Sequence, residues 1–265
     1  MILNPTNNER YEILDEYIGL RSSSPHNTLM ILAEGDSHFS IGGMTSNILM
    51  AVDKELTRKG WNVLIANASC PGDTTRDVGS YDGLLYLADW DACLLSIGGN
   101  DLIEALPQIV TPNQHAKPYV NIQSMWGSVE EKLNSMITAF HLHYPKAPVL
   151  LNGYCAIGTQ RKSALFQAGP WAGPQLAALG IDETFHDATV NEALRQFNGN
   201  LSALAGGRKV AAINTLYALP IPTWSDSLWK KGGNWAWRNE IHPSIQGYNV
   251  LASMYWVPTL LRYIK

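Results

Sequence analysis

The sequence predicts an α/β fold with a mainly parallel sheet, because short apolar runs alternate with helical patterns along the chain. Each apolar run is continuous rather than alternating, which is typical of strands that are covered on both faces. The chain shows no internal repeat and no linker, and it is long enough to bury one large core. We therefore expect a single domain over residues 1–265, with right-handed crossovers. The five predicted strands span residues 28–33, 62–66, 92–97, 148–152 and 209–214.

Helical patterns fill the stretches between these strands. Apolar residues at four-residue spacing over 48–56 predict a helix that ends at residues 59–60. A second apolar stripe over 129–140 follows Ser128-x-x-Glu131, which is typical of a capping box at a helix start. Two further helices are expected over residues 183–205 and 243–257.

Three segments do not fit this alternation. They are rich in proline, glycine and tryptophan, and each follows a predicted strand, so we expect them to form the rim of a pocket. They span residues 102–125, 156–180 and 220–238. Beyond them, Pro258 is expected to stop or kink the final helix.

The bulk composition excludes several classes of protein. Hydrophobic residues make up 46% of the chain and charged residues 16%, which fits a compact fold and argues against disorder or a coiled-coil rod. A net charge of −4 gives no electrostatic support for binding phosphate backbones, so we expect no nucleic-acid partner. No run of about 18 apolar residues and no signal-peptide pattern is present, so we expect a cytoplasmic protein with no membrane partner. A signal peptide that has been removed is left open, and the sequence indicates no oligomeric state.

The cysteines and a pair of histidines have structural interpretations. Cys70, Cys93 and Cys155 are far apart and form no paired spacing, so we expect free thiols. His141-x-His143 lies in the last turn of a predicted helix, where the two rings would face different sides. An interaction with the helix C-terminal dipole is therefore favoured over a metal site.

One serine and one histidine stand where a nucleophile and its base are expected. Gly-Asp-Ser at 35–37 follows the first apolar strand directly, which places the Ser37 hydroxyl on the turn beyond a buried strand. His-Pro at 242–243 opens the last amphipathic stretch. In a parallel α/β sheet the working crevice lies beyond the carboxyl ends of the strands, where Ser37 is expected. Ser37 would attack the substrate, and His242 would take its proton and return it to the leaving group.

Acyl transfer also needs hydrogen-bond donors for the negative charge that develops on the carbonyl oxygen. The candidates are the backbone N–H groups of Ser37 and Gly72 and the side-chain amide of Asn100. Gly72 lies in a loop after the second predicted strand, where the missing Cβ lets the backbone approach a substrate. Asn100 belongs to Gly-Gly-Asn-Asp at 98–101 and donates without having to be protonated.

These residues resemble the SGNH, or GDSL-type, serine hydrolase family of esterases and lipases. The likeness rests on Gly-Asp-Ser at 35–37, the glycine at 72, Gly-Gly-Asn-Asp at 98–101 and His-Pro at 242–243, in the family's order and over roughly the whole chain. The resemblance implies a flavodoxin-like three-layer α/β/α fold with a mainly parallel five-stranded sheet. It also implies hydrolysis of a small-molecule ester or thioester without a metal or an organic cofactor.

The chain departs from the family's pattern at the third member of the catalytic unit. The family usually carries an aspartate three residues before the histidine, whereas position 239 is an asparagine. The Asn239 amide oxygen can accept a hydrogen bond from the imidazole Nδ1–H but brings no charge. Glu240 is one residue out of register and is expected to point away, and Asp226 in the preceding loop is the alternative acid.

The sequence therefore predicts a carboxylic-ester hydrolase that works through an acyl-enzyme on Ser37, with His242 as general base. A small acyl or acetyl ester is favoured, since no amphipathic lid pattern suggests a lipase acting at an oil surface. One alternative is a carbohydrate O-acetylesterase, because a tryptophan-rich loop precedes His242, although such residues also simply pack a long loop. Another is a weak relative that binds an ester or a glycan, because Asn239 is neutral. The loop tryptophans are Trp224, Trp229, Trp235 and Trp237.

Overall fold

The computed structural model describes residues 2–3, 10–40, 47–79, 83–113, 116–159, 169–206, 209–222 and 234–264. Among these, six strands form one parallel sheet in the order β1-β3-β2-β4-β7-β8. The five predicted strands are confirmed, and a short strand, β1, is added at the edge beside β3. The strands are β1 (Ile2–Leu3), β2 (Thr28–Gly35), β3 (Asn62–Asn67), β4 (Ala92–Ser96), β7 (Val149–Asn152) and β8 (Val210–Ile213).

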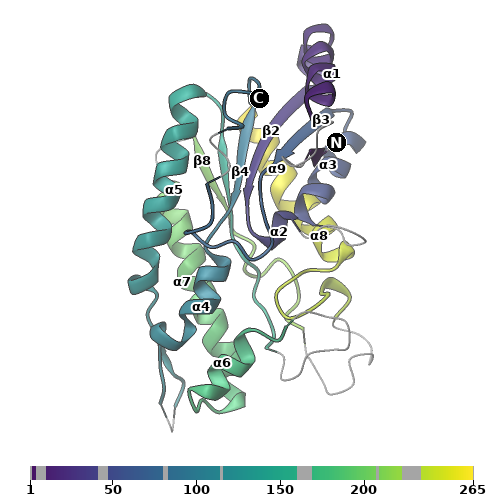
Figure 1. The fold of residues 1–265 in the computed structure, drawn as a ribbon. Helices are drawn as coiled ribbons and strands as arrows, with labels where there is room; N and C mark the ends of the chain where they lie inside the picture. The colour runs from purple at the N-terminus through teal and green to yellow at the C-terminus, as the bar shows by residue number, and fades with distance from the viewer. Residues whose placement is uncertain are drawn as a thin grey trace.

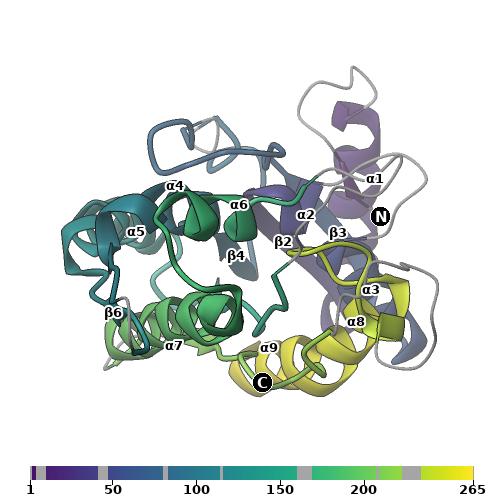
Figure 2. The same ribbon diagram turned by 90° about the horizontal axis from the view of Figure 1, so that it is seen from below.

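Helices cover both faces of the sheet, which gives the three-layer α/β/α arrangement (Figures 1 and 2). One layer contains α3 (Ile48–Arg58), α8 (Ile245–Leu251), a π-helical segment (Ala252–Trp256) and α9 (Val257–Ile264), which pack together. The other contains α4 (Gly99–Ile109), α5 (Gln123–His143), α6 (Ala172–Ala178) and α7 (His186–Leu204). The remaining elements are α1 (Arg10–Ser23), α2 (Ser37–Ser40), single 3₁₀ turns at Pro25–Asn27, Glu183–Phe185 and Asn234–Ala236, and an antiparallel ribbon of β5 (Val110–Thr111) and β6 (Tyr119–Val120).

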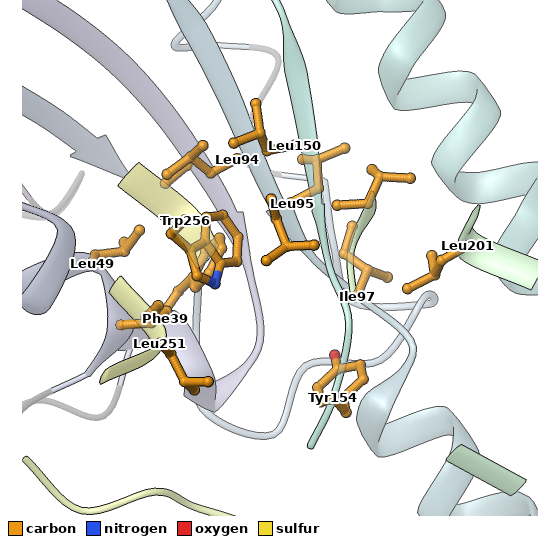
Figure 3. Close-up of a cluster of buried hydrophobic side chains, with 14 of the residues drawn as sticks. Phe39, Leu49, Leu94, Leu95, Ile97, Leu150, Tyr154, Leu201, Leu251 and Trp256 are labelled. Carbon is orange, nitrogen blue, oxygen red and sulfur yellow. The ribbon is translucent and has the colours of Figure 1, made fainter. Parts of the chain in front are cut away.

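Burial of the strands on both faces of the sheet explains why their sequences are continuous apolar runs. All eight residues of β2 and all five of β4 are buried, because helices lie over both of their faces. Figure 3 shows Phe39 and Trp256 on one side of β4 and Leu201 of α7 on the other. The rings of Phe39 and Trp256 meet edge to face with their centroids 5.7 Å apart, so α2 is packed onto the C-terminal helical layer.

The chain reverses its direction of travel across the sheet between β2 and β4. After β2 it crosses through α3 to β3, whereas after β4 it crosses through α4 and α5 to β7 on the other side. The carboxyl ends of β2 and β4 therefore lie side by side at a topological switch point, the usual place for a ligand crevice in such sheets. Ser37 follows β2 and Asn100 follows β4, so both residues lie at this switch point.

One predicted helix start is wrong. The Ser128-x-x-Glu131 pattern does not begin a helix, because α5 already starts at Gln123, where the Asn121 side chain accepts a hydrogen bond from the Gln123 N–H at 3.0 Å. Burial of Trp126 adds a turn that the capping signal did not predict. Segment 102–125 is accordingly not one irregular rim, since it contains most of α4, the β5–β6 ribbon and the start of α5.

Pro258 does not stop the last helix, although a stop is the first of the two outcomes predicted for this position. The π-helical segment Ala252–Trp256 precedes it, and the helix continues from Val257 to Ile264. The wider π turn carries an extra residue per turn just before a proline that lacks an N–H, so the chain stays helical there. The other predicted helices are confirmed as α3, α7 and α8.

No helix among the described residues is long and apolar enough to cross a bilayer. None of the three cysteines, which all lie in the described residues, forms a disulfide; Cys70 is exposed, and Cys93 and Cys155 are buried. His141 Nε2 lies 3.1 Å from the carbonyl oxygen of Ala147, and no metal-binding group of His, Cys, Asp and Glu occurs in the described part of the chain.

Candidate active site

The turn after β2 is built around a glycine that no other residue could replace without displacing a strand. Gly35 has a φ of 153°, and a Cβ at this position would lie 2.2 Å from the backbone oxygen of Ser96 in β4. The next residue, Asp36, donates its N–H to that same oxygen at 2.8 Å. This close approach of two backbones delivers Ser37 to the start of α2, directly beyond the carboxyl end of the sheet.

Asp36 fixes the turn from the inside. Its Oδ1 accepts hydrogen bonds from the Ser96 hydroxyl at 2.8 Å and the His38 N–H at 3.0 Å, and its Oδ2 accepts one from the Tyr154 hydroxyl at 2.5 Å. Burial alone would raise the pKa of this carboxyl, but the bonds and charge from His38 and the bond from Tyr154 lower it below its usual value. Asp36 is therefore a buried, ionised anchor beside Ser37.

The structure brings Ser37, His242 and Asn239 together in one hydrogen-bonded line. Ser37 Oγ lies 2.7 Å from His242 Nε2, and His242 Nδ1 lies 3.0 Å from Asn239 Oδ1. All three side chains are buried, with 8%, 5% and 5% of their surface exposed. This is the arrangement of nucleophile, base and orienting group that serine hydrolysis requires.

The hydrogen bonds around Asn239 determine which nitrogen of His242 carries the proton. Asn239 Oδ1 also accepts the backbone N–H groups of Ile241 at 3.2 Å and His242 at 2.8 Å. An amide nitrogen could not face these two donors, so the oxygen must point at the ring. Nδ1 is therefore protonated, and Nε2 is left unprotonated to accept the Ser37 hydroxyl proton.

The electrostatic surroundings of His242 keep its imidazole neutral. Burial, followed by the charges of His38 and Arg238, outweighs the opposing effect of Asp36 and lowers the pKa of His242 to about 3. A neutral ring can accept a proton, so His242 is ready to act as a base over a wide range of pH. The neutral Asn239 contributes no charge that would raise this pKa.

The two other candidate donors for an oxyanion lie on neighbouring segments. Residues 68–79, which we call the Gly72 loop, follow β3, and Cys70 in this loop donates its N–H to the carbonyl oxygen of Gly35 at 3.1 Å. Gly72 has a φ of 90° and open space where a Cβ would stand. Asn100 lies in the first turn of α4 and donates from Nδ2 to the Asp73 carbonyl oxygen at 2.9 Å. The loop thus lies against both the turn that carries Ser37 and the helix that carries Asn100.

A pocket with a volume of about 30 Å³, open to solvent, lies beside Ser37. Its polar wall contains Ser37, His38 and Asn100, whereas aliphatic side chains form much of the rest. These apolar residues come from four different segments and suit the hydrocarbon part of a ligand. They are Ile103, Ile157, Leu194 and Ile241.

Glu240 points away from the imidazole, as the sequence predicts. It is fully buried, and its carboxylate accepts the backbone N–H groups of residues 171–173 at the start of α6. This ties the His242 loop to Trp171, whose ring meets the His242 ring edge to face at 5.8 Å. Asp226, the other acid considered for His242, lies outside the described residues, as do Trp224 and Trp229. Trp235 is exposed, and Trp237 is buried with its Nε1 bonded to the Pro220 carbonyl oxygen.

Several residues of the site were not predicted from the sequence. Tyr154 bonds Asp36 across 118 positions, and Trp171 reaches His242 from a segment without a recognisable motif. His38 packs its ring 5.6 Å from that of His242. Only His38 had a usable signal, since it directly follows the predicted nucleophile.

Comparison with known families matches residues 35–250 to the GDSL-like Lipase/Acylhydrolase family. No curated protein matches the sequence. A family 3 carbohydrate esterase from Talaromyces cellulolyticus is 14% identical, with a TM-score of 0.52 over 89% of this chain and 98% of its own. A lipase from a goat rumen metagenome is 13% identical, with a TM-score of 0.54 over 89% of this chain and 97% of its own. At these identities the likeness to the two structures is one of fold.

Proposed function

Because the chain belongs to the GDSL-like lipase/acylhydrolase family, and is therefore a serine hydrolase acting on esters, we propose that it hydrolyses small carboxylic esters through an acyl-enzyme on Ser37. The observation that carries this proposal is the line of Ser37 Oγ, His242 Nε2 and Nδ1, and Asn239 Oδ1, joined at 2.7 and 3.0 Å. The proposed reaction uses no cofactor.

In the proposed reaction, Ser37 Oγ attacks the ester carbonyl carbon while its proton passes to Nε2 of His242. The tetrahedral intermediate carries its negative charge on the former carbonyl oxygen, which the N–H groups of Ser37 and Gly72 and the Asn100 amide would stabilise. Collapse breaks the bond to the alcohol oxygen, which takes the proton from His242. A water molecule then attacks the acyl-enzyme with His242 again as base and releases the carboxylic acid.

We expect a fluorophosphonate to add one inhibitor group per chain, at Ser37. The reagent phosphonylates activated serines, and Ser37 is the serine bonded to an unprotonated imidazole nitrogen. Intact mass and peptide mapping would locate the adduct, and Ser37→Ala should give neither adduct nor turnover of a p-nitrophenyl ester. An adduct on another serine, or a labelled enzyme that still turns over, would refute the assignment. Binding without turnover would instead favour the weak relative that Asn239 suggests.

The acyl group should occupy the apolar pocket, and its size favours short chains. A volume of about 30 Å³ has room for only about two water-sized groups. We expect kcat/KM for p-nitrophenyl acetate and butyrate to exceed that for the dodecanoate by at least about tenfold. Each methylene that the pocket cannot accommodate costs about 1 kcal/mol or more in transition-state binding.

Ile103→Phe should narrow this pocket and lower kcat/KM for butyrate relative to acetate by about tenfold. The matched control is Ile18→Phe on α1, which makes the same change at an exposed position at the other end of the sheet (Figure 1). Equal losses for the two esters, or the same effect from both variants, would place the acyl group elsewhere.

A second candidate, a carbohydrate O-acetylesterase, is favoured by one observation. Trp171 is only partly buried and lies beside His242, where an indole ring could stack on the sugar that leaves as the alcohol. Acetate release from acetylated sugars, with Trp171→Leu lowering it more than hydrolysis of p-nitrophenyl acetate, would support this candidate. Equal effects on both substrates would leave the general esterase as the better description.

A further inference from the structure

We propose that Asp101 is a positioning residue that sets the separation of the two outer oxyanion donors, the Gly72 N–H and the Asn100 amide. The inference rests on the proposed function, because it assigns a role within that oxyanion hole. The two donors belong to different segments, the Gly72 loop and the first turn of α4, so their separation depends on what joins those segments. Asp101 joins them directly.

The Asp101 carboxylate accepts three hydrogen bonds from a single residue of the Gly72 loop. The Thr75 N–H lies 3.2 and 3.1 Å from the two carboxylate oxygens, and the Thr75 hydroxyl lies 2.6 Å from Oδ1. Bonds to a charged acceptor are shorter and stronger than neutral ones. The carboxylate therefore clamps both the backbone and the side chain of Thr75, three residues beyond Gly72.

A second contact couples this clamp to the orientation of Asn100. Its Nδ2 carries two hydrogens, and one of them is held by the Asp73 carbonyl oxygen at 2.9 Å. The other is available to the substrate oxygen, because Asn100 lines the pocket beside Ser37. Any movement of the loop relative to α4 would displace the Asp73 carbonyl and turn the Asn100 amide with it.

Hydrogen bonds within the Gly72 loop hold the turns on both sides of Asp73. The Asp73 N–H donates to the Cys70 carbonyl oxygen at 3.3 Å across the turn that contains Gly72. Asp77 accepts the Thr74 N–H at 3.0 Å and the Thr74 hydroxyl at 2.7 Å. The loop also has a third link to α4, an ion pair between Arg76 and Glu104 at 3.0 Å. Both side chains of that pair are largely exposed, so it contributes little to holding the loop.

The expected consequence is kinetic. Oxyanion donors act within about 2.7–3.1 Å of the developing charge, and a displacement of about 1 Å can cost about a hundredfold in rate. Asp101→Ala should therefore lower kcat by about ten- to a hundredfold while KM stays within about twofold, since the substrate pocket is formed by other residues. Affinity for a trifluoromethyl ketone, which forms an oxyanion on Ser37, should fall by a similar factor.

Thr75→Val removes only the hydroxyl partner and should give a smaller loss in kcat. Combining it with Asp101→Ala should cost no more than Asp101→Ala alone, because both changes break the same clamp. Asp101→Asn, which keeps one acceptor oxygen, should recover part of the rate. The control is Glu104→Ala, which breaks the exposed pair between the same two segments and should leave kcat within about twofold.

Different results would contradict the positioning role of Asp101 and the proposed function. If Asp101→Ala raises KM at unchanged kcat, or loses activity only in proportion to its unfolded fraction by circular dichroism, the positioning role is wrong. If Asp101→Ala does not fold, additive effects of Thr75→Val and Asp101→Asn would overturn the proposal in its place. If Ser37 takes no label and Asn100→Ala keeps full activity, the proposed function itself fails, which is a different outcome.

Discussion

Replacing Asn100 by alanine should lower kcat by about two to three orders of magnitude, as the loss of one oxyanion donor does in other serine hydrolases. In its proposed role the amide would stabilise charge that exists only in the transition state, so KM should change little. Initial rates with p-nitrophenyl acetate measure both constants. The free energy of unfolding should be nearly unchanged, because Asn100 is partly exposed and the substitution removes a hydrogen bond to the Asp73 carbonyl oxygen at the rim of the pocket.

Ile103→Ala, also in α4 and beside the same pocket, is the matched control. It should act through KM and acyl-chain preference, because an apolar wall contacts the substrate equally before and during the reaction. If Asn100→Ala instead raises KM at constant kcat, Asn100 binds the substrate in its ground state. The oxyanion assignment would then be wrong.

Replacing Asn239 by aspartate should raise kcat by about ten- to a hundredfold. The new carboxylate would take the place of Oδ1, 3.0 Å from His242 Nδ1, and would stabilise the imidazolium that forms when Ser37 loses its proton. A charge at that distance raises the pKa of an imidazole by about one to three units. The pKa of His242, about 3 in the present chain, would therefore move upward.

The pH profile of kcat/KM measures this shift. Protonation of His242 removes the base, so activity falls as pH drops through its pKa, and a raised pKa moves that fall to higher pH. Glu240→Gln is the first control, because the Glu240 carboxylate binds backbone N–H groups at α6 and the profile should not move. Asp226→Asn is the second. An unchanged rate and profile for Asn239→Asp, with a large loss in Asp226→Asn, would show that another acid serves His242.

The sequence predicted five of the six strands of the described sheet, because those five are largely buried on both faces and so carry a local signal. The short edge strand β1 was missed. The helix start at Gln123 was missed because it depends on the burial of Trp126, which no local capping pattern reports. The continuation of the helix past Pro258 was missed for a related reason, since the π turn that precedes the proline has no sequence signature.

The residues of the site likewise differ in whether a local pattern predicts them. Short sequence patterns contain Ser37, His242, Asn239 and Asn100. The structure places the first three within hydrogen-bond distance in series. Tyr154 and Trp171 could not be predicted, because their roles are contacts between segments far apart in the chain. Asp101 stood inside a recognised pattern, but its partner Thr75 lies in a loop whose path the sequence does not reveal.

The distribution of the three thiols also makes the protein suitable for site-selective labelling. Cys93 and Cys155 are buried, and burial raises the pKa of Cys155 to about 12, so both are protected from alkylation. Cys70 is exposed and can be reached by a reagent. Partial burial of its sulfur, followed by the charges of Asp73 and Glu34, raises the pKa of the Cys70 thiol, so it reacts best in mildly alkaline buffer. A maleimide fluorophore would therefore attach two residues before Gly72. Its emission would report movement of the Gly72 loop during turnover without any cysteine having to be removed.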